Sequence, residues 1–188
     1  MKRQRKVLMN TILYFIQNCG TVHNTKLFKF LFFFEHEHLR ITGQPAIGLD
    51  YTAKEKGPVP MDLWREVQDE QAAPADLAHA IQAVPVKYDD DAETKTGFRW
   101  SAIIPCDMRV FSPLQREILE RIRFRFEGAT RDMIVDASHE SKTPWRTVFL
   151  QLGLDNPINF ADSVSDLPEF KRDAFEDYED YRRLILGH

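Results

Sequence analysis

Glycine is scarce in this chain, and cysteine is almost absent. The 188 residues contain 8 glycines, none of them in a phosphate-binding loop, and 2 cysteines, Cys19 and Cys106, without metal-type spacing. No serine is flanked by glycines, and neither cysteine has the context of a nucleophile. We therefore expect no enzymatic activity and no cofactor, and the low cysteine content predicts a reduced, cytoplasmic protein.

Long apolar runs and an excess of positive charge are also missing. No stretch of about 18 uncharged apolar residues occurs, so we expect no membrane span. The formal net charge is -4 and the pI is near 5.9, which argues against direct nucleic-acid binding. The basic start, MKRQRK, leads into an amphipathic run, which is not typical of a signal peptide.

Phenylalanine, by contrast, is abundant, with 14 copies gathered toward the first part of the chain. Residues 4–18 have helical apolar spacing, and a second helix is predicted within residues 21–43, with Asn24 or Thr25 as its cap and Gly43 just beyond its end. The run FKFLFFF leaves that second helix almost no polar face, so we expect it to be buried nearly all round as the centre of the core.

The remaining elements are mostly helical. An extended stretch precedes residues 57–60, GPVP, and a helix with Leu63, Trp64 and Val67 follows. Alternating residues around 84–88 and 98–104 predict a β-hairpin with a long acidic loop, and further helices begin at Ser112, Thr130 and Thr143. The predicted fold is mainly α (α+β): a compact bundle of about six or seven helices around the buried Phe-rich helix, with a small β-hairpin or short antiparallel sheet.

The tail predicts one more amphipathic helix, over residues 167–185. Its apolar stripe is expected to comprise Phe170, Ala174, Tyr178, Tyr181 and Ile185, with acidic residues mostly on the other side. We divide the chain into a main domain, residues 1–160, and this acidic helix in residues 161–188, which either docks on the domain or faces a partner.

Histidines and an aspartate run are the candidates for metal or acid–base chemistry. His36 and His38 would point about 200° apart on a helix, so they cannot share one ion. His139 beside Glu140 fits either an acid–base group or a helix C-terminus. Residues 89–91, DDD, lack the spacing of a calcium loop. We predict no metal site.

The GPVP stretch predicts a rigid corner. Pro58 and Pro60 fix φ and favour extended Gly57 and Val59, which would end a strand sharply, and Pro60 suits the start of a helix. The corner either stabilises the fold or forms a rigid edge of a recognition surface.

Together these motifs resemble the Panacea domain, or SocA-like antitoxin domain, also found in phage-associated GepA-like proteins. The resemblance spans about residues 8–150 and rests on TKLFKFLFFFEHEHLRITGQP, YTAKEKGPVPMDLW, the helix at Ser112, and SHESKTPW. It implies an antitoxin of a bacterial or prophage toxin–antitoxin system that neutralises a cognate protein toxin by direct binding. The acidic chain suits a basic toxin acting on RNA, tRNA or nucleotides.

Two alternatives remain: an adaptor that delivers a toxin to a AAA+ protease, and an enzyme centred on a histidine. For the binding function, we predict partner contacts from the motifs YTAKEKGPVPMDLW and SHESKTPW and from two acids of the tail. These residues are Tyr51, Lys54, Gly57, Pro58, Val59, Pro60, Trp64, His139, Trp145, Asp177 and Asp180.

Overall fold

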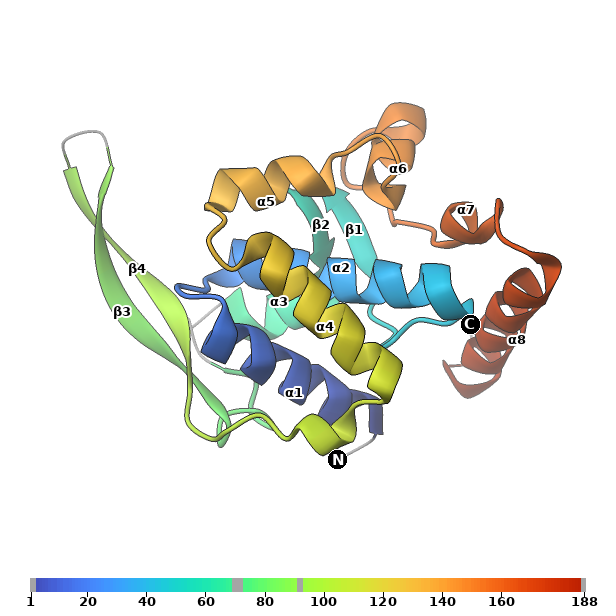
Figure 1. Cartoon of the computed structure of the whole chain (residues 1–188). Helices are drawn as coiled ribbons and strands as arrows, with labels where there is room; N and C mark the ends of the chain where they lie inside the picture. The colour runs from blue at the N-terminus through green and yellow to red at the C-terminus, as the bar shows by residue number, and fades with distance from the viewer. Residues whose placement is uncertain (1–2, 69–72, 91–92, 187–188) are drawn as a thin grey trace.

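The computed structural model describes residues 3–68, 73–90 and 93–186. These residues form eight α-helices, one short 3-10 helix and two antiparallel two-stranded sheets (Figure 1). The mainly α fold with a small β component is confirmed. The elements in chain order are α1 Arg3–Asn18, α2 Asn24–Thr42, β1 Tyr51–Lys54, β2 Gly57–Pro60, α3 Met61–Gln68, β3 Ile81–Asp90, β4 Glu93–Ala102, the 3-10 helix Met108–Val110, α4 Pro113–Phe126, α5 Arg131–Ser138, α6 Pro144–Leu152, α7 Ala161–Val164 and α8 Glu169–Leu186. The short α7 is the helix that the sequence did not predict.

The Phe-rich α2 is the centre of the core, as predicted. It packs against α1, α4, α5, α7 and β2. Phe30, Phe32 and Phe34 are each 0% exposed. The ring of Phe30 stacks on Phe15 of α1 with centroids 4.5 Å apart, and Phe33 stacks on Phe126 of α4 at 4.9 Å. Stacked aromatic rings therefore connect α2 to α1 and to α4.

The predicted starts of α4, α5 and α6 and the end of α2 are confirmed, whereas the N-cap residue of α2 is His23 and not Asn24 or Thr25. Ser112 and Gln115 form a reciprocal capping box at the start of α4, with Pro113 as its first residue. The side chains of Thr130 and Thr143 cap α5 and α6. Gly43 ends α2 in the left-handed conformation, with φ of 79°.

The GPVP segment differs from the prediction. Instead of ending a strand, it is itself strand β2 and pairs with β1 in an antiparallel hairpin, from Tyr51 opposite Pro60 to Lys54 opposite Gly57. Gly57 is not extended but has φ of 91°. The opposite side of β1 is bonded to residues 155–158, so β2 is an edge strand, where prolines are tolerated.

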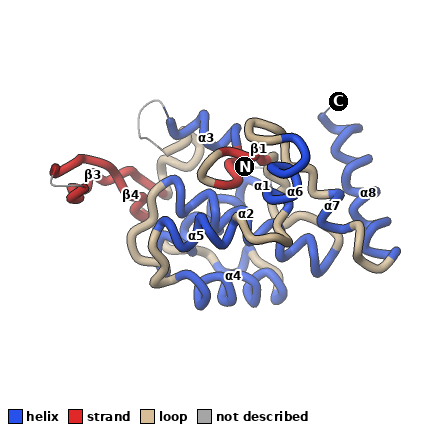
Figure 2. Tube along the Cα trace, turned by 90° about the horizontal axis from the view of Figure 1, so that it is seen from above, coloured by secondary structure: helices blue, strands red, loops and turns tan. Residues whose placement is uncertain are grey.

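The second hairpin is also longer than predicted. Backbone pairing runs through ten residues of each strand, as far as Asp90 opposite Glu93, so most of the predicted acidic loop is strand. Asp91 lies outside the described residues. This ribbon projects from the body on the side away from α8 (Figures 1 and 2). Residues 89–90 and 93–97 are polar or glycine and have no apolar alternation, which is why the pattern understated the length of the hairpin.

Helix α8 forms, but with a different inward face. Phe175 is 6% exposed and packs with Leu39, Val164 and Leu167, whereas Phe170, Tyr181 and Ile185 are 69%, 60% and 56% exposed. The helix is turned so that Ala174, Phe175 and Tyr178 face the body, and Arg182 pairs with Asp50. The predicted stripe is therefore divided, because Ala174 and Tyr178 lie on the inward face whereas Phe170, Tyr181 and Ile185 lie outside it. None of the helices in the described ranges is both long and apolar enough to cross a bilayer.

Candidate partner-binding site

The β1–β2 hairpin packs directly on the core through Gly57. A Cβ atom at this position would lie 2.4 Å from Ser138 Oγ of α5 and 2.6 Å from Lys29 Cε of α2. The positive φ of 91° independently favours glycine. Both the backbone conformation and the space available therefore require glycine here, where the hairpin meets α2 and α5.

Lys29 lies beneath the hairpin and is one of the most buried side chains of the protein, at 1% exposed. Its Nζ donates a hydrogen bond to the carbonyl of Pro58 at 2.8 Å. Among the described residues, no carboxylate forms an ion pair with it. Burial lowers the pKa of Lys29 to about 7, because the charged form loses its hydration.

The late SHESKTPW motif holds the hairpin from the other side. The Trp145 indole donates from Nε1 to the carbonyl of Lys54 at 3.0 Å. His139 stacks on Trp145 with ring centroids 3.7 Å apart, and Trp145 stacks on Phe149 at 5.0 Å. Burial, with a smaller contribution from the charge of Lys29, lowers the pKa of His139. The two motifs that the sequence singled out thus form one structural unit.

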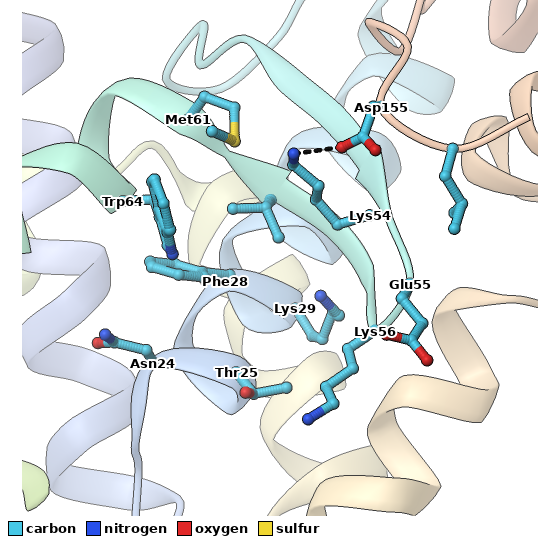
Figure 3. Close-up of a pocket in the computed structure, with 12 residues that line it drawn as sticks. Asn24, Thr25, Phe28, Lys29, Lys54, Glu55, Lys56, Met61, Trp64 and Asp155 are labelled. Carbon is cyan, nitrogen blue, oxygen red and sulfur yellow. Dashed lines mark hydrogen bonds and ion pairs between the residues drawn. The ribbon is translucent and has the colours of Figure 1, made fainter. Parts of the chain in front are cut away.

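A cavity opens beside this unit, and we call it the hairpin cavity. It has a volume of about 500 Å³ and lies between the start of α2, the β1–β2 turn and the start of α3, with Phe28, Lys29, Lys56, Trp64 and Leu154 among its lining residues (Figure 3). Lys54 lines it too and pairs with Asp155. The cavity combines apolar walls with several lysines.

The outer face of α8 is a second exposed feature. Its apolar side chains Phe170, Tyr181, Leu184 and Ile185 are 69%, 60%, 85% and 56% exposed. The acidic Asp173, Glu176, Asp177 and Asp180 are exposed on the same helix. We call these eight residues the α8 outer face. Within the part of the chain that is described, nothing covers it.

The structure brings together most of the predicted contact residues, but it buries several. Gly57, Pro58 and Pro60 are buried in the hairpin, and Val59 is half-buried. Tyr51 is 2% exposed and Trp145 is 3% exposed, so both support the surface from inside. Lys54 and Trp64 line the hairpin cavity, and His139 lies against Trp145. Asp177 and Asp180 are exposed on α8, which does not border that cavity.

Sequence reasoning missed the burial of charged side chains on α2. Three buried charges lie on this helix, namely Lys26, Lys29 and Glu35, which are 6%, 1% and 1% exposed. The Glu35 carboxylate accepts hydrogen bonds from the backbone N–H groups of Ile47, Gly48 and Leu49 at 2.9, 2.6 and 2.9 Å, and so holds the loop before β1. The sequence contained a signal for these contacts, because a charged residue within an otherwise apolar helix is buried with it and then needs a hydrogen-bonding partner.

The histidines do not gather into a site. His36 stacks on Phe32, and burial lowers the pKa of His36 to about 4. His38 Nδ1 bonds to the carbonyl of Gln44, and His139 lies on α5's end against Trp145. Among the described residues, no three His, Cys, Asp or Glu side chains are grouped closely enough to hold a metal ion.

The comparisons with known proteins gave one match. Neither the curated proteins nor the solved structures contain a significant match to the chain. The family model described as "Antitoxin SocA-like, Panacea domain" matches residues 27–146, which includes most of α2, the β1–β2 hairpin, Ser138, His139 and Trp145. Since this is more than half of the chain, the protein belongs to the SocA-like antitoxin family of Panacea domains.

Proposed function

We propose that the protein is the antitoxin of a bacterial or prophage toxin–antitoxin system. It acts in the cytoplasm by binding its cognate protein toxin directly, without a catalytic step or a cofactor of its own. Membership of the SocA-like antitoxin family supports the antitoxin role. The observation that carries the binding mechanism is the α8 outer face, four large apolar side chains exposed beside four carboxylates.

Exposed apolar groups of this size are typical of interaction surfaces. Tyr181, for example, has an apolar ring and a polar hydroxyl, a combination enriched at interfaces that keep a wet edge. The neighbouring acids suit a basic partner, such as a toxin that acts on RNA, tRNA or nucleotides. Lys54 and Trp64, which line the hairpin cavity, remain further candidates for contact.

The experiment is toxin rescue in a bacterial host. The chain is co-expressed with the product of each neighbouring open reading frame that alone stops growth, and complex formation is measured by co-purification. We expect Tyr181→Ser with Leu184→Ser to abolish rescue and co-purification together. The matched control is Phe124→Ser on α4, because Phe124 is 81% exposed and away from α8.

Three outcomes would contradict the proposal. The first is that no neighbouring product is neutralised, and the second is that the α8 double variant rescues as well as the control. The third is that the toxin disappears in a host with its AAA+ proteases but persists, active, in a host without them. That last result would make the protein an adaptor for degradation instead of a blocking partner.

A further inference from the structure

We propose that the hairpin cavity binds a small aromatic anion, a molecule that combines one planar ring with one phosphate or carboxylate group. This site is independent of the toxin contact proposed for α8. The volume of about 500 Å³ lies within the range of roughly 300–1,000 Å³ that is usual for small-molecule pockets. The occupant that we propose is a free small molecule.

The apolar walls supply the place for a ring. Trp64 of α3 and Phe28 of α2 both border the hollow, together with Met61 and Leu154 (Figure 3). Within the described part of the chain, Trp64 pairs with no other aromatic ring, although many rings of this protein do. Trp64 is half-buried against the core and borders the hollow, so its indole offers a ring on which a ligand can stack, and stacked rings gain about 0.5–1.5 kcal/mol beyond area burial.

The lysines supply the place for a negative charge. Three lysines and two carboxylates line the cavity, and Lys54 forms an ion pair with Asp155. The remaining charged residues of the lining are Lys29, Lys56 and Glu55, so positive charge is in excess. Lys29 gives the stronger argument for an anion than Lys56 does. It is 1% exposed, and among the described residues its Nζ is hydrogen-bonded only to the backbone carbonyl of Pro58. A buried ammonium group without a counter-charge is costly, and a bound anion would provide that counter-charge.

The start of α2 adds neutral donors at the same place. Asn24 and Thr25, its first residues, line the cavity, and the preceding residue, His23, makes no capping hydrogen bond through its side chain. The first backbone N–H groups of a helix have no partner within the helix and favour anions. They act here in addition to the lysines.

The first test measures binding of phenyl phosphate to the purified chain, without any toxin, by calorimetry and by the indole N–H resonance of Trp64. Phenol carries only the ring, and inorganic phosphate carries only the charge. We expect phenyl phosphate to bind at least about tenfold more tightly than either. Trp64→Leu and Lys56→Gln should each weaken it about tenfold or more, whereas Lys87→Gln, an exposed lysine of β3, should change nothing.

The second test measures the uptake of protons when the anion binds. Near pH 8, Lys29 is largely uncharged, and an anion beside it favours the charged form, so binding should take up protons and the measured enthalpy should depend on the buffer. The other charged groups facing this region are Lys54, Lys56, Glu55 and Asp155 of the cavity and His139 from the side of α5. Lys29→Met should remove the proton uptake.

The proposal is overturned if phenyl phosphate, phenylacetate and adenosine monophosphate all fail to bind at about 10 mM. It is also overturned if phenol binds as tightly as phenyl phosphate, or if Trp64→Leu and Lys56→Gln bind like the control. Should Lys29→Met fail to fold, the variants at Trp64 and Lys56 still decide the question. Failure here leaves toxin rescue unaffected, and failure of toxin rescue leaves this binding unaffected.

Discussion

Lys29 shows how a single residue can make stability depend on pH. Its pKa is lowered from 10.5 to about 7 by burial, so between these two values the unfolded chain binds a proton that the folded chain does not. The free energy of unfolding should therefore rise with pH across this window. Below about pH 7 both states are protonated, and the cost of burying the charge is present in full.

We predict that this rise amounts to about 1 kcal/mol per pH unit between pH 7.5 and 10, measured by urea denaturation. Lys29→Met, which keeps the length of the side chain, should remove most of that slope and raise stability near pH 7. Lys87→Gln on the exposed ribbon serves as control. An unchanged slope in the Lys29 variant would mean that Lys29 is solvated in the folded protein.

Gly57 is the residue whose replacement should cost the most for its size. Alanine at this position would have to adopt φ near 91° and would also meet Ser138 Oγ and Lys29 Cε. The backbone alone costs about 1–3 kcal/mol in such a conformation. We predict that Gly57→Ala lowers the free energy of unfolding by at least about 2 kcal/mol.

The matched control is Gly128→Ala, because a Cβ at Gly128 has nothing within 4 Å and its φ is not positive. Chemical denaturation of both variants decides the matter. Equal stability of the two would show that the hairpin moves easily away from α2 and α5.

At the scale of elements, the prolines of the β1–β2 hairpin contribute to stability by another mechanism than Gly57 does. Pro58 is buried, faces Ala53 across the ladder, and offers its carbonyl to Lys29. Alanine retains that carbonyl, so the main loss in Pro58→Ala is the restriction that proline places on the unfolded chain.

We therefore predict a loss of about 1 kcal/mol for Pro58→Ala in thermal or urea unfolding, with toxin rescue maintained. Pro113→Ala at the start of α4 is the control, since it removes a proline of similar restriction far from the hairpin. Lost rescue at unchanged stability would instead assign the hairpin to the toxin interface.

The elements that the sequence predicted well are those with local causes. The start of α4 follows from Ser112, Pro113 and Gln115, and the burial of α2 follows from its run of phenylalanines, because neither depends on distant residues. The hairpin could not be recognised in this way. Its turn residues, Glu55 and Lys56, are not typical turn formers, and β2 contains two prolines, which usually argue against a strand.

The inward face of α8 could be predicted only in part, for a related reason. Phe170, Tyr181 and Ile185 share a stripe, but the choice between this stripe and the one with Phe175 depends on where Leu39 and Val164 lie in the folded chain. The candidate site has the same limit. Sequence could single out GPVP and SHESKTPW, but the cavity beside them exists only once α2, α3 and the hairpin are assembled.

Across the whole molecule, the distribution of charge matters more than the net charge of -4. The ribbon of β3 and β4 and the helix α8 lie on different sides of the body (Figures 1 and 2). The carboxylates of Asp177 and Asp180 are exposed on α8, and Asp180 is paired only with its neighbour Arg183. An exposed pair of this kind adds little stability, so these acids are free to act on an approaching partner.

Reversing both charges should therefore change kinetics without changing the fold. We predict that Asp177→Lys with Asp180→Lys slows association with a basic toxin by about tenfold at low salt, while the melting temperature stays nearly the same. The difference should shrink as salt is raised, because the Debye length falls from about 30 Å at 0.01 M to about 10 Å at 0.1 M.

The control for this reversal is Asp132→Lys with Asp136→Lys on α5, because both aspartates are exposed and the net charge changes by the same amount. Like Asp180, Asp132 is exposed and paired with a neighbouring arginine, Arg131, but it lies on another helix. If both variants slow association equally, the toxin responds only to net charge, and α8 has no special place in its approach. If neither does so, the acids of α8 do not face the toxin, and its contact must then come from the apolar side chains or from the border of the hairpin cavity.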